Sequence, residues 1–439
     1  MDITVLHVAP HYGGGVGKVV RSLIDDQQVS NFVHRLLALE SINEVMLQWA
    51  GQRQIACLSN ALLDTTALNQ WLGGADIIHL HWWNHPLLMY WMVYVPMPPI
   101  RCILWSHVNG LYAPQVFFKG LFTYPDCFVF STAYSFQSPC VAEYEADIKL
   151  VQSRSKVKLI GARVKKNDAC FGIGYIGTVD YIKMHPEFIN LCLNARIDDA
   201  KFIVCGGPQQ DLLRHQVVQV GVESRFDIRG VITDVNQVLF ELDVFGYPLN
   251  PEHYGTGEQV LLEAMGAGVV PVVLDTGCEK YIIDHGKNGI IATSLEEYSA
   301  ALNYLRQNID VLRSMSRHGV EKTRDLMALQ GKDAWTEHYL SLLQRDKSQH
   351  NITVAQELLS FSKGSRLLLQ SYGSTEWALR LLRDLLDKSK KLSAASFPSG
   401  LFSATRGSPY HYLKYFPSDP VLQIFCERLD HCKTMESTL

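Results

Sequence analysis

Residues 252–273 read EHYGTGEQVLLEAMGAGVVPVV, a loop that leads into a short apolar helix and then into an apolar strand. Glycines stand at both ends of the helix, and those after it let the helix end and pack closely on the strand. Glu263 is the one charged residue inside this helix. A buried carboxylate is costly unless it is paired or hydrogen-bonded, and the two hydroxyls of a ribose are suitable donors. An internal salt bridge is the alternative explanation for Glu263.

The start of this helix has the features of an anion site. Thr256 and Gln259 have the T-x-x-Q spacing of a capping box, which predicts a helix that begins at Thr256. The amides of Gly257 and Glu258 then lack intrahelical partners and face outward, where the helix dipole favours negative charge. The stretch therefore predicts a site for the phosphates of a nucleotide.

The composition is that of a globular protein long enough for two or three domains. The chain has 439 residues, of which 47% are hydrophobic and 19% are charged. A net charge of -4 argues against a nucleic-acid partner, because such a partner is usually bound by an excess of basic residues. The ten cysteines form no CxxC pair or other zinc spacing, so we expect reduced thiols in a cytoplasmic protein.

Short apolar runs alternate with helical patterns along most of the chain, which predicts an α/β fold with parallel sheets. Two sets of such runs are separated by the polar, basic stretch 159–169, which we interpret as a linker. We therefore expect two Rossmann-like domains, at 1–165 and 166–345. Residues 346–439 predict a mainly helical C-terminal extension, whose role the sequence leaves open.

The longest apolar run, LLMYWMVYVPMPPI at 87–100, has 14 residues and three prolines, so it is too short to span a bilayer. It predicts a buried helix that enters a proline-rich loop, with an interfacial helix that touches lipid as the alternative. The N-terminus, MDITVLHVAP, has an acidic residue where a signal peptide needs basic ones. We expect a cytoplasmic protein and leave open a peripheral contact with the inner face of the membrane.

A glycine-rich loop, HYGGGVGKVV at 11–20, lies between the first predicted strand and the first predicted helix. Gly14, Gly15 and Gly17 let the backbone approach a ligand closely, and the helix N-terminus favours an anion. Lys18 stands where the dinucleotide fingerprint has its last glycine, and the loop departs from the Walker pattern as well. We expect a ligand-facing loop of neither type, with a purely structural turn as the alternative.

Polar residues end two neighbouring predicted strands, in HLHWWNHP at 79–86 and in WSHVNG at 105–110. The carboxyl ends of parallel strands border the crevice where open α/β sheets bind ligands. We expect His107 to hydrogen-bond a ligand or handle a proton there, with a structural histidine as the alternative. Trp82 and Trp83 offer stacking faces to a sugar, unless they belong to the core. The histidines of these segments have no metal-ligand spacing and no accompanying carboxylate, so no metal site is predicted.

Lys183 lies in the loop after the first strand of the second half, GYIGTVDYIKMHP at 174–186. A lysine at this position reaches a diphosphate as a point charge, although a solvated surface lysine is the alternative. The sequence contains no Asp-x-Asp, the carboxylate pair with which many transferases hold a nucleotide sugar through a divalent metal. We therefore expect a diphosphate to bind to amides, Lys183 and helix dipoles, without a metal or another cofactor.

Together these motifs resemble the GT-B-fold glycosyltransferases, in particular the retaining group 1 family (glycosyltransferase family 4). The resemblance covers about 1–340. It rests on GYIGTVDYIKMHPEF, on VCGGP at 204–208, and on 252–273 followed by GKNGII at 286–291. It implies two Rossmann-like domains that face each other across a cleft. The N-terminal domain would bind the acceptor, and the C-terminal domain the nucleotide sugar.

The resemblance also implies roles for single residues. Glu263 matches the glutamate that holds the ribose. Glu252 matches the first glutamate of the family if TGE is an insertion, and Glu258 is the competing candidate. Glu252, His107 and Lys183 then form the catalytic set. The residues implied to bind the donor are Gly14, Gly15, Gly17, Gly206, Gly255, Thr256, Gly257, Glu258 and Glu263, and those implied to bind the acceptor are His81, Trp82, Trp83 and Asn84.

The expected function is transfer of a sugar from a nucleotide-sugar donor to a hydroxyl of a glycan or lipid-linked acceptor. The resemblance implies retention of configuration, no metal, and a place in polysaccharide or glycolipid biosynthesis. In one departure from the family pattern, Thr178 and Val179 stand where an arginine is expected. Two other functions therefore stay open: a non-catalytic scaffold subunit with this fold, and a sugar-nucleotide epimerase. The fold leaves the base, the sugar and the acceptor open.

Overall fold

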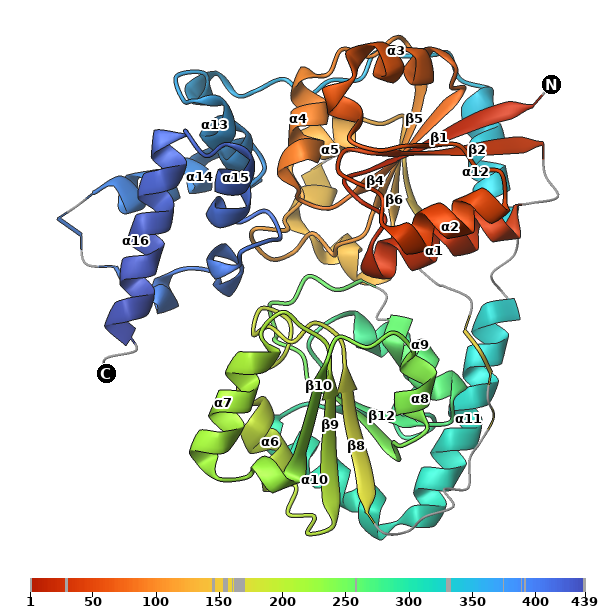
Figure 1. Ribbon diagram of the computed structural model, residues 1–439, viewed down its shortest axis with the longest axis vertical. Coiled ribbons are helices and arrows are strands. Elements are labelled where there is room, and N and C mark those ends of the chain that lie inside the picture. Colours follow the sequence, from red (N-terminus) through yellow and green to blue (C-terminus); the bar gives the residue numbers. More distant parts are fainter. Residues whose placement is uncertain are drawn as a thin grey trace. The chain divides into compact units, whose positions relative to one another are not determined.

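The computed structural model describes residues 2–27, 31–143, 147–152, 157–159, 161, 170–256, 259–328, 333–373, 375–387, 389–390 and 392–436. The chain divides into two compact units, residues 1–155 with 332–439 (unit 1) and residues 156–331 (unit 2). Each unit contains one sheet with helices packed around it (Figure 1). The units differ from the predicted domains because residues 332–345 and the C-terminal extension pack with the N-terminal sheet. The predicted linker at 159–169 lies almost entirely outside the described residues.

The sheet of unit 1 has seven parallel strands in the order β3-β2-β1-β4-β5-β6-β7. Its central strands are buried on both faces, which explains their apolar residues, and they also carry the buried His7, His79 and His81. The strands are β1 (Ile3–Ala9), β2 (Phe32–Ala38), β3 (Cys57–Leu58), β4 (Ile77–Trp82), β5 (Arg101–Ser106), β6 (Cys127–Phe130) and β7 (Ile148–Leu150).

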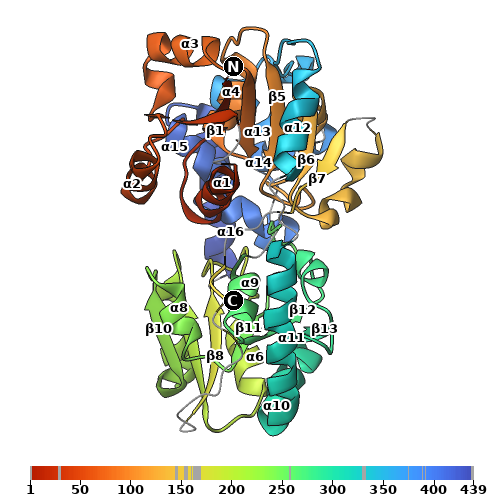
Figure 2. The same cartoon turned by 90° about the vertical axis from the view of Figure 1, so that its right-hand side faces the viewer.

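Helices connect these strands, and one helix from the far end of the chain joins them. The connecting helices are α1 (Gly14–Asp26), α2 (Glu44–Gln52), α3 (Thr65–Gly73), α4 (Pro86–Tyr94) and α5 (Lys119–Thr123). The additional helix, α12 (Asp333–Leu343), lies against β5 (Figure 2). Trp335 of α12 packs on the rings of His79 and Trp105, with centroids 4.6 Å apart in both pairs. This burial of aromatic area explains why α12 joins unit 1 although it directly follows unit 2 in sequence.

The C-terminal extension is mainly helical, as predicted. Its helices are α13 (Lys363–Gln370), α14 (Thr375–Leu386), α15 (Pro409–Tyr415) and α16 (Pro420–Glu436). Both α13 and α15 pack on α4. Ile352 donates its amide to the carbonyl of Met92 at 2.9 Å, and Arg366 donates from Nη1 to the hydroxyl of Tyr94 at 3.2 Å. The extension therefore covers part of the apolar segment 87–100.

Unit 2 contains the second sheet, six parallel strands in the order β10-β9-β8-β11-β12-β13. Helices α6, α7 and α10 lie on one side of it and α9 and α11 on the other (Figure 1). The two Rossmann-like domains predicted from the sequence are thus present. The elements of unit 2 are β8 (Phe171–Ile176), α6 (Phe188–Asn194), β9 (Ala200–Cys205), α7 (Gln210–Val220), β10 (Phe226–Gly230), α8 (Val235–Leu239), β11 (Val244–Tyr247), α9 (Gln259–Gly266), β12 (Val270–Leu274), β13 (Ile290–Ala292), α10 (Leu295–Gln307) and α11 (Ile309–Ala328).

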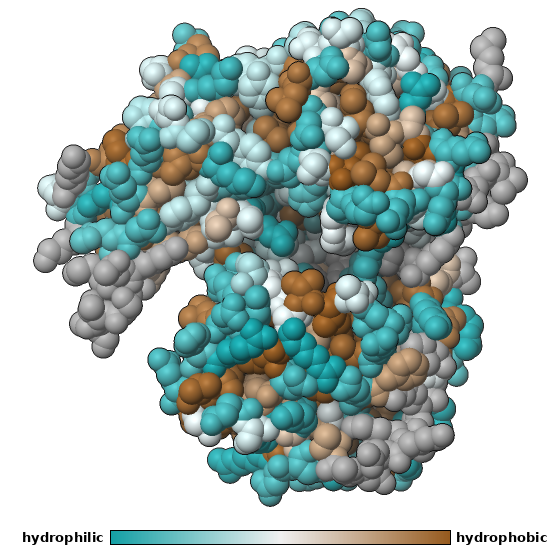
Figure 3. Space-filling view, in the orientation of Figure 1, coloured by the Kyte–Doolittle hydropathy of each residue, from teal (hydrophilic) through white to brown (hydrophobic). Residues whose placement is uncertain are grey.

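The apolar run at 87–100 forms the buried helix α4, as predicted, with Leu88, Met89, Trp91 and Met92 all inaccessible or nearly so. Among the described parts of the chain, no helix combines the length and apolar character needed to cross a membrane. Hydrophilic and hydrophobic residues are interspersed over the face shown in Figure 3. None of the ten cysteines, all within the described ranges, forms a disulfide.

Candidate functional site

Two turns follow β8 and β9 at the carboxyl edge of the unit 2 sheet, where the donor site is predicted. Val179 donates its amide to the carbonyl of Gly207 at 2.9 Å, and Gly206 donates its amide to the carbonyl of Gly230 at 2.7 Å. The backbone of Gly206 has a φ of +133°, and a Cβ on it would lie 1.7 Å from the carbonyl oxygen of Gly177. The close approach of the two turns therefore requires glycine at position 206.

A second pair of loops at this edge, 178–186 after β8 and 248–255 after β11, is joined by Asn250. Its amide donates to the carbonyl of Lys183 at 2.8 Å, and its side chain donates to another carbonyl of the same loop at 2.7 Å. The ammonium of Lys183 lies 5.8 Å from the centre of the Tyr254 ring, within range of a cation–π contact. The structure thus brings Lys183 to the loop that opens the stretch 252–273.

The two glutamates matched to the family differ in exposure. Glu252 is exposed in the loop before α9, and its amide donates to Oδ1 of Asn250 at 3.0 Å. Glu263 lies within α9 between the buried Leu262 and Ala264, and it is itself only half-buried. Glu263 is therefore less buried than the apolar sequence of its helix suggested.

Thr256, the predicted start of α9, is half-buried, and the described part of the helix runs from Gln259, so the exact start stays a prediction. The amides of Gly257 and Glu258, predicted to meet phosphates, lie outside the described residues. Their role stays a prediction.

A buried pair that the sequence did not indicate supports this loop. Nε2 of His253 lies 3.4 Å from Oε1 of Glu279, and both side chains are almost inaccessible. Nδ1 of His253 accepts a hydrogen bond of 3.0 Å from the amide of Gly255, one of the residues predicted to bind the nucleotide sugar. A Cβ on Gly277 would lie 2.5 Å from Nε2 of His253, so a side chain at position 277 would displace the imidazole. The pair was missed because Glu279 follows β12, far along the chain from His253.

The glycine-rich loop of unit 1 leads into α1. A Cβ on Gly17 would lie 2.1 Å from the carbonyl oxygen of Tyr12, so packing of the helix on its own loop explains this glycine. Gly14 has a φ of +59°, and both Gly14 and Gly15 are exposed. Among the described residues, no atom lies within 4 Å of a Cβ at either position. These two glycines leave space for a ligand, as a ligand-facing loop requires.

The four residues predicted to bind an acceptor, at the end of β4, are enclosed by protein. His81, Trp82 and Asn84 have no exposed surface, and Trp83 is 8% exposed. Nδ2 of Asn84 donates to Oγ of Ser371 at 2.9 Å, and Oδ1 of Asn84 accepts from the hydroxyl of Tyr412 at 2.9 Å. Asn84 therefore attaches the C-terminal extension to the sheet, and Trp82 and Asn84 offer no open face to an acceptor in this structure.

His107, predicted to be catalytic, stands at the end of β5 and is partly exposed. Its amide donates to the carbonyl of Trp82 at 2.8 Å, and its Nε2 lies 3.0 Å from Nδ1 of the buried His81. Burial disfavours the charged imidazole and lowers the pKa of His107 to about 3. His107 is therefore neutral near pH 7, so it acts there as a hydrogen-bonding group and not as a cation.

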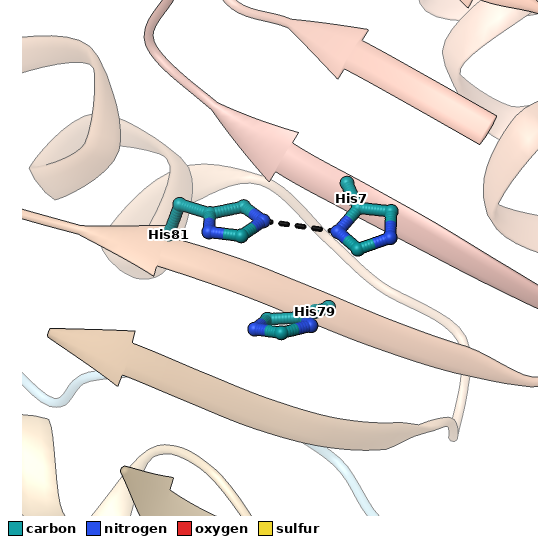
Figure 4. Close-up of side chains that lie close together, drawn as sticks. All are labelled: His7, His79 and His81. Atoms are coloured by element: carbon teal, nitrogen blue, oxygen red, sulfur yellow. Dashed lines mark hydrogen bonds between the residues drawn. The ribbon is translucent and has the colours of Figure 1, made fainter. Parts of the chain in front are cut away.

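His81 belongs to a cluster with His7 and His79, drawn in Figure 4, which the sequence did not predict as a unit. Nδ1 of His7 lies 3.0 Å from Nε2 of His81, and Nδ1 of His79 lies 2.7 Å from the hydroxyl of Tyr339. Burial lowers the pKa of all three imidazoles well below the usual value. The available signal was the H-x-H spacing of β4, which places both side chains on one face of the strand.

Three neutral imidazoles are potential metal ligands, and the ligand atoms of this cluster lie within 4.8 Å of one another. The facing nitrogens of His7 and His81, 3.0 Å apart, leave space for a shared proton, whereas zinc lies about 2.0–2.1 Å from each nitrogen ligand. The ring of His79 is stacked on that of His81 with centroids 4.4 Å apart (Figure 4). The lone pairs of its nitrogens therefore lie nearly parallel to the His81 ring and do not point toward it. A metal ion would require these rings to turn, and the observed geometry is that of a hydrogen-bonded chain.

Comparisons with known proteins agree with a fold of two Rossmann-like domains. Residues 171–308, most of unit 2, match the family model described as "Glycosyl transferases group 1". The chain is similar over 78% of its length to the structure of HepE from Anabaena in complex with UDP and glucose, of which it covers 100%, with a TM-score of 0.60 and 14% identity. The fold is GT-B. A comparison with curated protein sequences gives no match.

Other solved structures with the GT-B fold are similar to the same degree. The structure of sucrose-phosphate synthase from Thermosynechococcus elongatus has a TM-score of 0.61 and 13% identity, covering 77% of this chain and 100% of that one. The pneumococcal O-GlcNAc transferase GtfA, in complex with UDP and GlcNAc, has a TM-score of 0.51 and 14% identity, covering 64% of this chain and 60% of that one. At such identities the likeness establishes the fold and leaves the substrates open.

Proposed function

We propose that the protein is a glycosyltransferase that moves a sugar from a nucleotide-sugar donor to a hydroxyl of a glycan or lipid-linked acceptor. The observation that carries the proposal is the pairing of loops 178–186 and 248–255 in unit 2. Asn250 joins them, so that Lys183 stands beside the loop of Glu252 within the matched group 1 domain. Among similar structures, HepE binds UDP and glucose, which supports a nucleotide-sugar donor for this chain as well.

In this proposal the donor is held by a cation, backbone amides and a carboxylate. Lys183 neutralises charge on the departing diphosphate, and the backbone amides of Gly257 and Glu258 donate hydrogen bonds to its oxygens. Glu263, half-buried on α9, binds the ribose hydroxyls. Glu252, exposed at the start of the loop, contacts the donor sugar. These groups need no metal to stabilise the leaving diphosphate, and metal-independent transfer with retention is part of the proposal.

The acceptor is proposed to bind to unit 1, beside the partly exposed His107. Trp83 is the one of the four predicted acceptor residues with some accessible surface. A role in polysaccharide or glycolipid assembly, at a cytoplasmic or peripheral membrane location, belongs to the same proposal. It comes from the family resemblance.

A thermal-shift series tests the donor site. We expect one nucleoside diphosphate among UDP, GDP, ADP and TDP to raise the melting temperature, with CMP as the monophosphate comparison. At about a hundred times its dissociation constant the ligand adds about 2.7 kcal/mol, which corresponds to a shift of a few degrees. The shift should be lost in Glu263→Ala and kept in Glu321→Ala, which removes an exposed glutamate from α11. A well-folded protein that responds to none of these nucleotides contradicts the proposal.

One observation favours a second candidate, a scaffold that binds a nucleotide or glycan without turnover. Val179, which stands where the family has an arginine, is 2% exposed and bonded into the turn, so it leaves the diphosphate one basic group fewer. Release of nucleoside diphosphate distinguishes the two functions. A glycosyltransferase releases it in proportion to the acceptor consumed, a scaffold releases none, and an epimerase converts the donor without an acceptor.

A further inference from the structure

Four histidines form one hydrogen-bonded line across the sheet of unit 1. His34, His7, His81 and His107 come from β2, β1, β4 and the end of β5, which are neighbours in the sheet. Their ring nitrogens are joined at 2.9, 3.0 and 3.0 Å. In every contact Nδ1 of one ring faces Nε2 of the next. The line therefore has Nε2 of His34 at one end and Nδ1 of the partly exposed His107 at the other.

The tautomers of the four rings depend on one another. A neutral imidazole carries one hydrogen, so one nitrogen donates and the other accepts. Each of the three contacts needs one donor and one acceptor, and once the hydrogen of one ring is placed, all the others follow. Either every ring carries its hydrogen on Nδ1 or every ring carries it on Nε2. Burial lowers the pKa of all four imidazoles, which keeps the line neutral near pH 7.

The buried end of the line decides between these two arrangements. Nε2 of His34 is buried and has no hydrogen-bond partner among the described residues. In the Nε2–H arrangement this end would bury an N–H group without an acceptor. In the Nδ1–H arrangement it buries a lone pair, and native proteins leave acceptors unsatisfied more readily than donors. The second arrangement is favoured, and it gives His107 a hydrogen on Nδ1.

We propose that His34, His7 and His81 are positioning residues that fix His107 as the Nδ1–H tautomer, so that it donates a hydrogen bond at the carboxyl edge of the unit 1 sheet. The recognised group is an oxygen that accepts a hydrogen bond, in a sugar hydroxyl or a phosphate. His107 then presents a donor without a positive charge. This role for His107 rests on the proposed glycosyltransferase function, whereas the tautomers themselves do not.

Nitrogen NMR of the full chain tests the tautomers without any substrate. In protein labelled with 15N-histidine, long-range proton–nitrogen correlations show which nitrogen of each ring carries hydrogen. Single variants that remove one histidine at a time identify the signals. We expect His34, His7, His81 and His107 each to carry hydrogen on Nδ1 alone. Hydrogen on Nε2 of His107, or stoichiometric zinc in the purified protein, overturns the proposal, since a metal would displace the shared protons.

The far end of the line provides the test of coupling. His34→Asp places a carboxylate beside Nε2 of His7, and an ionised carboxylate only accepts hydrogen bonds. At about pH 9, where imidazoles are neutral, all remaining rings should reverse and His107 should carry its hydrogen on Nε2. His34→Leu supplies no acceptor and should leave His107 on Nδ1. His431→Asp, at an exposed site on α16, controls for the added charge. An unchanged His107 in His34→Asp shows that the line does not couple the rings.

Activity gives a separate readout. Loss of the donated hydrogen bond should lower kcat of His34→Asp about tenfold relative to His34→Leu, with a smaller change in KM for the donor. Equal kcat values in the two variants, despite reversed tautomers, overturn the role of His107 in the reaction. If the protein has no transferase activity at all, the NMR result still decides the tautomers, so failure of the proposed function and failure of this inference are distinguishable.

Discussion

The line of buried histidines makes unit 1 sensitive to acid. Burial lowers the pKa of His34 to about 4 and that of His107 to about 3, from the ordinary value of 6.5. A group whose pKa is lowered by folding contributes stability above its unfolded pKa and loses it as the pH falls toward the folded pKa. Between about pH 7 and pH 5 the unfolded chain binds a proton at each of these histidines, whereas the folded chain does not.

By the linkage relation, the free energy of unfolding falls by about 2 kcal/mol per histidine between pH 7 and pH 5, hence by about 4 kcal/mol for the pair. His7, His79 and His81 shift in the same direction and add to the loss. A decrease of this size is a large part of the stability of a typical domain. Unit 1 should therefore unfold at a markedly lower urea concentration at pH 5 than at pH 7.

Tryptophan fluorescence measures this effect on unit 1 alone, because all eight tryptophans of the chain lie outside residues 156–331. His34→Gln removes one of the titrating groups, so its loss of stability between the two pH values should be smaller by about 2 kcal/mol. His431→Gln, which changes an exposed histidine, should keep the full loss. A variant at position 34 with the same pH dependence as the unchanged protein would refute the assignment of the effect to the buried histidines.

Three further predictions concern the turns, the glutamates and the extension. Gly206→Ala, whose Cβ would lie 1.7 Å from a carbonyl oxygen, should destabilise unit 2 by more than about 2 kcal/mol in urea unfolding followed by circular dichroism. Gly221→Ala, at a φ of +72° and with no described atom within 4 Å of the added Cβ, should lower the free energy of unfolding by only about 1 kcal/mol. Glu252→Ala should lower turnover more than donor affinity in steady-state assays; if Glu258→Ala abolishes turnover while Glu252→Ala is silent, the alignment of the two glutamates is wrong. Asn84→Leu should lower the free energy of unfolding by about 3 kcal/mol or more, because it leaves buried partners in the extension unpaired. Limited proteolysis should then cleave the extension faster. Unchanged cleavage would show that Asn84 does not hold the extension.

Local patterns were sufficient for the elements themselves. Alternating apolar runs and helical patterns predicted both parallel sheets, and the run at 87–100 predicted the buried helix α4. The predicted start of α9 at Thr256 adjoins residues 257 and 258, which lie outside the described residues, and it stays a prediction. Glu263 is less buried than the apolar composition of its helix suggested. Local sequence thus gives the type of an element more securely than the exposure of one side chain.

The partners of distant residues required the structure. His253 and Glu279 meet because the loops after β11 and β12 adjoin at one edge of the sheet, and Asn84 meets Ser371 and Tyr412 because the extension folds back onto α4. Neither contact leaves a periodic signal, since the residues belong to segments that are separated along the chain.

By itself the sequence determined that the chain forms two Rossmann-like domains with a helical extension, because strand and helix patterns depend on neighbours within a few residues. Only the tertiary structure decided that α12 and the extension belong to unit 1, and that His34, His7, His81 and His107 form one line. The reason is physical. Strand order and register place side chains from different strands within hydrogen-bonding distance, and these are set by packing of the whole sheet and not by the sequence of any one strand.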